Sequence, residues 1–197
     1  SVALYIPGSG SNMGGFGTLT KTWAKSPEEA LVRFPGSLKI AQAGNPERGS
    51  GDLGSGMMGM SEGIRMTLLD GKKYWQDMLA FEAGTGPKPV FDPTLDLISG
   101  LWRHEYPLSV HTQIYQVVNK TIEMVAEEMG LPVYIDHGTF DGWRAAAKAQ
   151  ELGVHAILGP RGITMGMNSP GFASYDQDGA VFGVAAQYQS LGHQRGG

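Results

Sequence analysis

The sequence predicts an α/β fold in which parallel strands alternate with helices, and two observations in its second half support this. Short apolar runs typical of buried strands lie at residues 108–110, 132–136 and 154–158. Each run precedes a stretch with the 3.6-residue apolar spacing of an amphipathic helix, at residues 113–129, 140–152 and 179–191. Strands that alternate with helices of this length form βαβ units, whose strands are parallel.

The first half of the chain predicts shorter strands, loops and three helices. Apolar runs at residues 2–6 and 18–23 are expected to be strands, the first of them buried. A helix is expected to begin at Ser26, because a serine N-cap, a following proline and two acidic residues all favour a helix N-terminus. The apolar spacing predicts two further helices at residues 60–83 and 94–102.

The composition is that of an ordinary globular protein. Of the 197 residues, 41% are hydrophobic and 17% are charged. The 15 basic and 19 acidic residues are interspersed and give a net charge of −4, so we expect no nucleic-acid partner. The apolar runs are too short to span a bilayer. We therefore expect a soluble protein without a membrane partner; the cytoplasm, export and homo-oligomer formation all stay open.

A glycine-rich loop is expected at residues 8–17, after the first strand. Its glycines do not have the G-x-G-x-x-G spacing of a dinucleotide site, and no phosphate-loop lysine follows them. The alternative is that the loop forms a wall of a pocket for a small-molecule substrate. On this interpretation Gly10, Asn12 and Gly14 bind substrate, together with Arg161 after the third strand of the second half.

Two histidines are the most informative residues of the sequence. His111 and His137 each follow a predicted parallel strand, one βα unit apart. Such strand ends share one edge, which carries the catalytic residues in a (β/α)₈ barrel, and neighbouring strands lie only about 5 Å apart. Each imidazole alone could merely cap its strand by bonding nearby backbone. Two at equivalent positions favour a shared divalent metal ion.

The remaining ligands of such an ion must be oxygen or nitrogen atoms, because the chain has no cysteine. Zinc, manganese or iron would suit imidazole with carboxylate or a modified lysine. Lys39 lies in an apolar stretch and has two interpretations: a side chain that extends its ammonium into water, or a lysine carboxylated on its amine that bridges metal ions. Three other histidines are expected to be structural or solvated: His104, His155 and His193.

Several segments together resemble one family. They are Ile6-Pro7-Gly8-Ser9-Gly10, Lys39-Ile40-Ala41, Val110-His111, Ile135-Asp136-His137-Gly138, Leu158-Gly159-Pro160 and residues 183–193. In order and spacing they are similar to the amidohydrolase superfamily, specifically its imidazolonepropionase-like branch. The resemblance implies a (β/α)₈ TIM-type barrel. It also implies a hydrolase in which one or two divalent ions activate water against the C–N bond of an amide or cyclic amide, and for this chain we expect zinc, with manganese or iron as alternatives.

The resemblance also implies individual roles. His111 matches the family's metal ligand after the fifth strand, and His137 matches the ligand after the sixth. Lys39 matches the metal-bridging lysine that acts in catalysis, although Lys21 competes for that role.

The sequence departs from the family in two ways. It has no His-x-His pair, and no aspartate follows a last strand, since Asp176 and Asp178 lie in a predicted loop. The chain also begins in an apolar run and ends soon after a helical pattern. We therefore expect residues 1–197 to form one partial barrel domain, an internal fragment truncated at both ends and inactive by itself. The alternatives are a non-catalytic small-molecule-binding protein on the same scaffold, and a barrel enzyme that uses His111 or His137 as an acid–base group.

Overall fold

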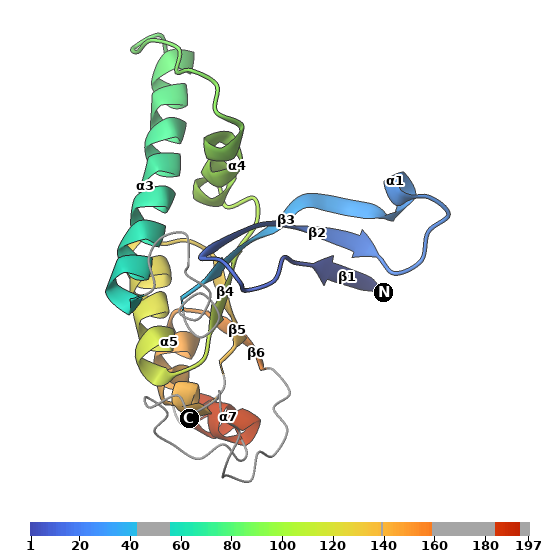
Figure 1. Ribbon diagram of the computed structural model, residues 1–197, viewed down its shortest axis with the longest axis vertical. Helices are drawn as coiled ribbons and strands as arrows, with labels where there is room; N and C mark the ends of the chain where they lie inside the picture. The colour runs from blue at the N-terminus through green and yellow to red at the C-terminus, as the bar shows by residue number, and fades with distance from the viewer. Residues whose placement is uncertain (43–55, 139, 159–183, 194–197) are drawn as a thin grey trace. The chain divides into compact units, whose positions relative to one another are not determined.

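The computed structural model of the protein describes residues 1–42, 56–138, 140–158 and 184–193 (Figure 1). Its strands follow one another in chain order within one sheet, from β1 to β6. The chain divides into two compact units, residues 1–109 and 110–197, although no change in composition marks this boundary. Within the described ranges, no helix combines the length and the apolar character needed to cross a membrane.

The first unit begins with an antiparallel meander of three strands. They are β1 (Val2–Tyr5), β2 (Met13–Lys21) and β3 (Leu31–Ala41). A single helical turn, α1 (Pro27–Ala30), lies between β2 and β3. The helix start predicted at Ser26 is confirmed, because the Ser26 hydroxyl accepts a hydrogen bond from the Glu29 amide at 3.2 Å.

Two expectations for this region are wrong. Residues 8–17 were expected to form a loop, but β2 begins at Met13 and includes three of the glycines. Close packing explains one of them, because a Cβ atom on Gly17 would lie only 2.7 Å from the Tyr5 carbonyl oxygen. The first strand was expected to be buried, yet Val2 and Tyr5 are 61% and 64% exposed. The strand is the first of the sheet and pairs antiparallel with β2, and antiparallel strands can leave one face exposed to solvent.

The helices of the first unit match the predicted apolar spacing. Helix α3 (Met57–Glu82) packs against α4 (Pro93–Trp102). Asp92 caps α4 by accepting hydrogen bonds from the Thr94 and Leu95 amides at 2.8 and 3.0 Å. The two helices approach closely at Gly71, where an added Cβ would overlap the Ile98 side chain.

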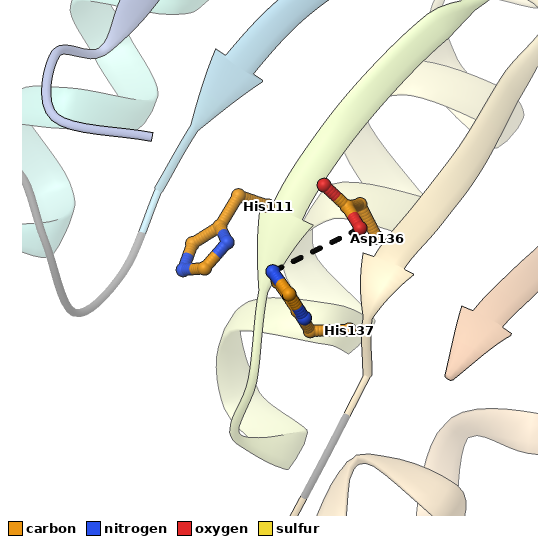
Figure 2. A group of neighbouring side chains, drawn as sticks. All are labelled: His111, Asp136 and His137. Carbon is orange, nitrogen blue, oxygen red and sulfur yellow. Dashed lines mark ion pairs between the residues drawn. The ribbon is translucent and has the colours of Figure 1, made fainter. Parts of the chain in front are cut away.

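The second unit contains the predicted alternation of strands and helices. Its elements are the end of β4 (Leu108–Thr112), α5 (Tyr115–Thr121), the π-helical η1 (Ile122–Glu128), β5 (Val133–His137), the 3₁₀-helical η2 (Phe140–Ala145), α6 (Ala146–Glu151), β6 (His155–Leu158) and α7 (Val184–His193). Strands β5 and β6 are parallel, with His137 opposite Leu158. The arrows of β4 and β5 point the same way in Figure 2. The predicted strand–helix order of this half is therefore confirmed.

Boundaries in the second unit differ from the prediction in detail. The helix predicted at residues 113–129 begins at Tyr115, and its second half is π-helical. The helix predicted at residues 140–152 begins as a 3₁₀-helix. Buried apolar side chains from β5 and from the helix after β4, among them Ile122, Val125 and Ile135, form the core here.

Candidate metal centre

Three side chains that can bind a metal ion meet at the ends of two neighbouring strands. His111 belongs to β4 and is only 3% exposed. Asp136 and His137 are the last two residues of β5. One ligand atom from each residue lies within 4.8 Å of the other two, and Figure 2 shows the three side chains turned toward a common space. Within the described part of the chain, this is the one cluster of three such residues.

The two imidazoles are close and nearly perpendicular. The ring centroids of His111 and His137 lie 4.7 Å apart, and the ring planes cross at 79°. Their strands lie side by side in the sheet and run in the same direction, so both rings project from the same edge (Figure 2). The expectation that the two histidines converge at one edge of the sheet is therefore confirmed.

The approach of Asp136 to His137 depends on an unusual backbone conformation. Consecutive residues of a regular strand point to opposite faces of the sheet. His137 departs from this geometry with a φ of 81°, and Gly138 follows with a φ of 50°. The Asp136 Oδ1 atom lies 3.9 Å from the His137 Nε2 atom. The left-handed backbone at the end of β5 thus places the side chains of Asp136 and His137 on the same side of the strand.

Hydrogen bonds support the strand ends behind the cluster. The Gly138 amide donates to the Thr112 carbonyl at 3.0 Å, which joins the residues immediately after the two histidines. The side-chain amide of Gln113 lies 3.3 Å from the His111 Nε2 atom. A metal-bound histidine donates its other ring N–H to an acceptor, so His111 can bind a metal ion through Nδ1 when the Gln113 amide presents its oxygen to Nε2.

The donor set fits a divalent ion. Two imidazole nitrogens and one carboxylate oxygen form the type of ligand set that suits zinc, manganese or iron. Tetrahedral zinc, with bonds of about 2.0–2.2 Å, holds its ligand atoms roughly 3.4 Å apart. The observed separations of up to 4.8 Å therefore need only a small side-chain rotation to close. Three protein ligands would leave a coordination position open, as catalytic zinc sites do.

Lys39 is buried, although two interpretations of it were open. It lies in β3 and is 1% exposed, so the interpretation that its ammonium extends into bulk water is wrong. Lys21, the competing lysine, is exposed at the end of β2. Both lysines belong to the first unit, so the role of Lys39 beside the two histidines stays a prediction.

The residues expected to bind substrate have varied surroundings. Asn12 is buried, and its side-chain amide donates to the Ala41 backbone carbonyl at 3.2 Å. The backbone carbonyl of Asn12 accepts from the Ala41 amide at 2.9 Å. Gly14 packs closely, since an added Cβ would lie 3.3 Å from the Lys39 side chain. Gly10 is exposed. Their role toward a substrate stays a prediction.

Other residues singled out by the sequence lie elsewhere. His104 forms a turn after α4 with a φ of 57°, and its amide donates to the Leu101 carbonyl. His155 is exposed at the start of β6. Neither joins the cluster, in agreement with the sequence-based expectation. Arg161, which is expected to bind substrate, lies outside the described residues, as do Asp176, Asp178 and the third predicted strand end at Gly159.

The carboxylate of the cluster was missed by sequence reasoning. Asp136 forms part of the motif Ile135-Asp136-His137-Gly138, but strand alternation places it on the face opposite His137. The available signal was the glycine after the histidine, which marks the end of a strand where left-handed backbone is common.

Comparison with known proteins links this chain to the fold of an amidohydrolase. A crystal structure of an amidohydrolase from Thermotoga maritima MSB8 is similar to this chain, with a TM-score of 0.73 and 25% sequence identity. The match covers 81% of this chain and 42% of that chain, so the chain spans about two fifths of the amidohydrolase's length. No family model and no curated protein matches the chain. The similarity supports a relation to the amidohydrolase superfamily and agrees with an α/β fold that is part of a TIM-type barrel.

Proposed function

We propose that this chain provides part of the active site of a metal-dependent hydrolase that cleaves C–N bonds in small amides or cyclic amides. The observation that carries the proposal is the meeting of His111, Asp136 and His137 at neighbouring strand ends. The similarity to an amidohydrolase supports hydrolase chemistry. Cleavage of a C–N bond and a place in the imidazolonepropionase-like branch rest on the sequence motifs.

The residues of the cluster have distinct tasks in this proposal. His111 and His137 bind one divalent ion, or one of a pair, through neutral imidazole nitrogens, and Asp136 contributes a negative charge to the same ion. We propose zinc, with manganese and iron as alternatives that suit the same donors. When bound, such an ion supplies Lewis acidity, which acidifies water and polarises a substrate carbonyl. The Gln113 side-chain amide lies beside His111 Nε2, and with its oxygen accepting from Nε2–H it orients the ring so that Nδ1 binds the ion.

The proposal is tested by elemental analysis of the purified full-length protein. His111→Ala and His137→Ala each remove one ligand from a small set, so metal content and turnover should fall together. The matched control is His155→Ala, because His155 is exposed at the start of the next strand and should not affect metal content. Circular dichroism should show unchanged helix content in all three variants. Undiminished metal in both His111→Ala and His137→Ala would overturn the proposal.

The bond type is tested separately with matched substrates. Turnover of amides and cyclic amides by the metal-loaded full-length protein, compared with esters of the same acids, distinguishes C–N from C–O cleavage. We expect hydrolysis of the amide series, and its loss after the metal is removed with a chelator. Hydrolysis restricted to the esters would contradict the C–N proposal and leave the metal centre intact.

We further propose that Lys39, and not Lys21, is the metal-bridging lysine. Fully buried lysines are uncommon, and Lys39 is 1% exposed while Lys21 is exposed. Lys39→Met should lower the number of bound ions per chain in the full-length protein, and Lys21→Met should not. Equal metal stoichiometry in the two variants would contradict this assignment.

A further inference from the structure

Asp141 is a buried carboxylate that joins the segments after the two histidines. It lies in η2 and is 1% exposed. Its Oδ1 atom accepts a hydrogen bond of 2.8 Å from the Tyr115 amide, the first residue of α5. Tyr115 is four residues after His111, and Asp141 is four residues after His137. The contact therefore joins equivalent points of the two segments that leave the metal centre.

A second contact joins the same segments nearer the histidines. The Gly138 amide donates to the Thr112 carbonyl at 3.0 Å, one residue after each histidine. This backbone bond and the Asp141–Tyr115 bond enclose a short stretch of both segments. Movement of the backbone that carries one imidazole away from the backbone that carries the other would have to stretch at least one of the two bonds.

Arg144 contacts Asp141, and Tyr188 lies near the same turn. The Arg144 guanidinium lies 3.4 Å from Asp141 Oδ2 and 4.6 Å from the centre of the Tyr115 ring. Tyr188 of α7 lies against the same turn, because Cβ atoms added to Gly138 and Gly142 would be 2.7 and 3.2 Å from its hydroxyl oxygen. Burial raises the pKa of Tyr188 above its usual range, and the charge of Asp141 adds to the effect.

We infer that Asp141 is a positioning residue of the metal centre, which sets the separation of the two imidazoles through its hydrogen bond to the Tyr115 amide. The inference rests on the proposed metal-binding function. Asp141 is not a member of the three-residue cluster, so it acts through the backbone that carries the ligands. Residues that hydrogen-bond metal ligands directly change metal affinity by about 10- to 100-fold when they are replaced, and we expect Asp141, which acts through the backbone, to lie at the lower end of that range.

The test measures Zn²⁺ affinity of the full-length protein by competition with a chromophoric chelator. Asp141→Ala deletes the acceptor and should raise the Zn²⁺ Kd by about tenfold or more. Asp141→Asn retains an oxygen that can accept from the Tyr115 amide, so its Kd should stay within about threefold of wild type. The visible spectrum of bound Co²⁺ should change in Asp141→Ala and remain wild-type in Asp141→Asn.

Asp92→Ala is the matched control for loss of a helix cap. Asp92 accepts from the first amides of α4 in the first unit, so its removal weakens a helix start without touching the metal centre. The Zn²⁺ Kd of Asp92→Ala should equal that of wild type. An equal change of Kd in Asp92→Ala and Asp141→Ala would overturn the positioning role.

A second pair of variants tests the same bond at its donor, the Tyr115 amide. This pair also provides a test if Asp141→Ala does not fold. Tyr115→Pro deletes the donor N–H, and proline is favoured at the first position of a helix. The preceding residue, Ile114, already has the extended conformation that a following proline requires, with φ −89° and ψ 155°. Tyr115→Ala removes the ring but keeps the N–H. Only Tyr115→Pro should weaken Zn²⁺ binding.

The outcomes separate this inference from the proposed function. A wild-type Kd in Asp141→Ala or Tyr115→Pro would overturn the positioning role and leave the metal centre standing. If Asp141→Asn binds Zn²⁺ as weakly as Asp141→Ala, loss of the hydrogen bond to the Tyr115 amide is not the cause of the weaker binding. A wild-type protein that binds no Zn²⁺, Mn²⁺ or Fe²⁺ would overturn the metal centre and the inference together.

Discussion

Asp136 and His137 are consecutive residues of one strand, yet the Asp136 Oδ1 atom lies 3.9 Å from the His137 Nε2 atom. The φ of 81° at His137 makes this approach possible. A strand of regular geometry would place the carboxylate and the imidazole on opposite faces of the sheet. The ligand set of the candidate metal centre therefore depends on backbone conformation as well as on residue type.

Asp136→Asn should weaken divalent-metal binding while leaving the fold unchanged. The replacement has nearly the same shape but removes the negative charge, so we expect the Zn²⁺ Kd to rise at least about tenfold and the thermal midpoint to change little. Isothermal titration of the full-length protein measures the effect. Asp77→Asn, on the exposed surface of α3, is the control and should bind like wild type. Unaltered affinity in Asp136→Asn would remove Asp136 from the ligand set.

Gly138→Ala should destabilise the second unit. The residue has a φ of 50°, and an added Cβ would lie 2.7 Å from the Tyr188 hydroxyl oxygen. The left-handed conformation alone costs an alanine about 1–2 kcal/mol, and the contact adds to that cost. Urea denaturation measures the loss. In a Tyr188→Phe background, which removes the hydroxyl, the same substitution should cost less. An equal cost in both backgrounds would contradict the contact.

Gly71→Ala should destabilise the packing of α3 against α4. The added methyl group would overlap the Ile98 side chain, and overpacking of this kind costs typically 1–3 kcal/mol. Denaturant unfolding should show the loss. In an Ile98→Ala background, which removes the overlapping atoms but is itself destabilising because Ile98 is buried, Gly71→Ala should cost less. Zn²⁺ affinity should stay at the wild-type value, because both residues belong to the first unit. A neutral Gly71→Ala would show that the helices can separate freely.

Stability should decline above about pH 10 because of Tyr106. Burial raises the pKa of the Tyr106 hydroxyl, and the nearby Glu105 charge raises it further; the hydroxyl also donates to the Leu97 carbonyl. An unfolded tyrosine loses its proton near pH 10 while the folded one keeps it. The unfolded state then binds fewer protons, so the unfolding free energy falls as pH rises, by at most about 1.4 kcal/mol per pH unit.

Tyr106→Phe measures that contribution. Urea denaturation at pH values from about 8 to about 11, which bracket the usual tyrosine pKa of about 10, gives the unfolding free energy as a function of pH. Above about pH 10 this free energy should decline less steeply in Tyr106→Phe than in wild type. Tyr5→Phe is the control, because Tyr5 is 64% exposed, and its slope should match wild type. Parallel slopes for Tyr106→Phe and wild type would contradict the prediction.

The positions of His111 and His137 could be predicted because local sequence controls them. The apolar run before each histidine and the amphipathic helix after it identify a parallel strand and its carboxyl end. Parallel neighbours bring these ends together, so the meeting of the two rings at one edge of the sheet, 4.7 Å apart, could be predicted from topology, although not their separation.

The antiparallel meander could not be predicted in the same way. Glycines usually weaken strands, so residues 14–17 resemble a loop in the sequence. In the structure the Tyr5 carbonyl and the Ile6 side chain leave no room for a Cβ on Gly17, and glycine is required by a contact distant in sequence. The sequence left the burial of Lys39 open for a different reason, because residue chemistry alone favours an exposed ammonium.

The left-handed backbone at His137 also gives a direction to evolutionary change at this position. A β-carbon at a φ of 81° carries a steric cost that glycine escapes and asparagine reduces. In a descendant of this protein that no longer binds a metal ion, selection for the imidazole would cease while the steric cost would persist. Substitution at position 137 would then favour glycine and asparagine over other residues, and a histidine there would be among the first features of the site to disappear.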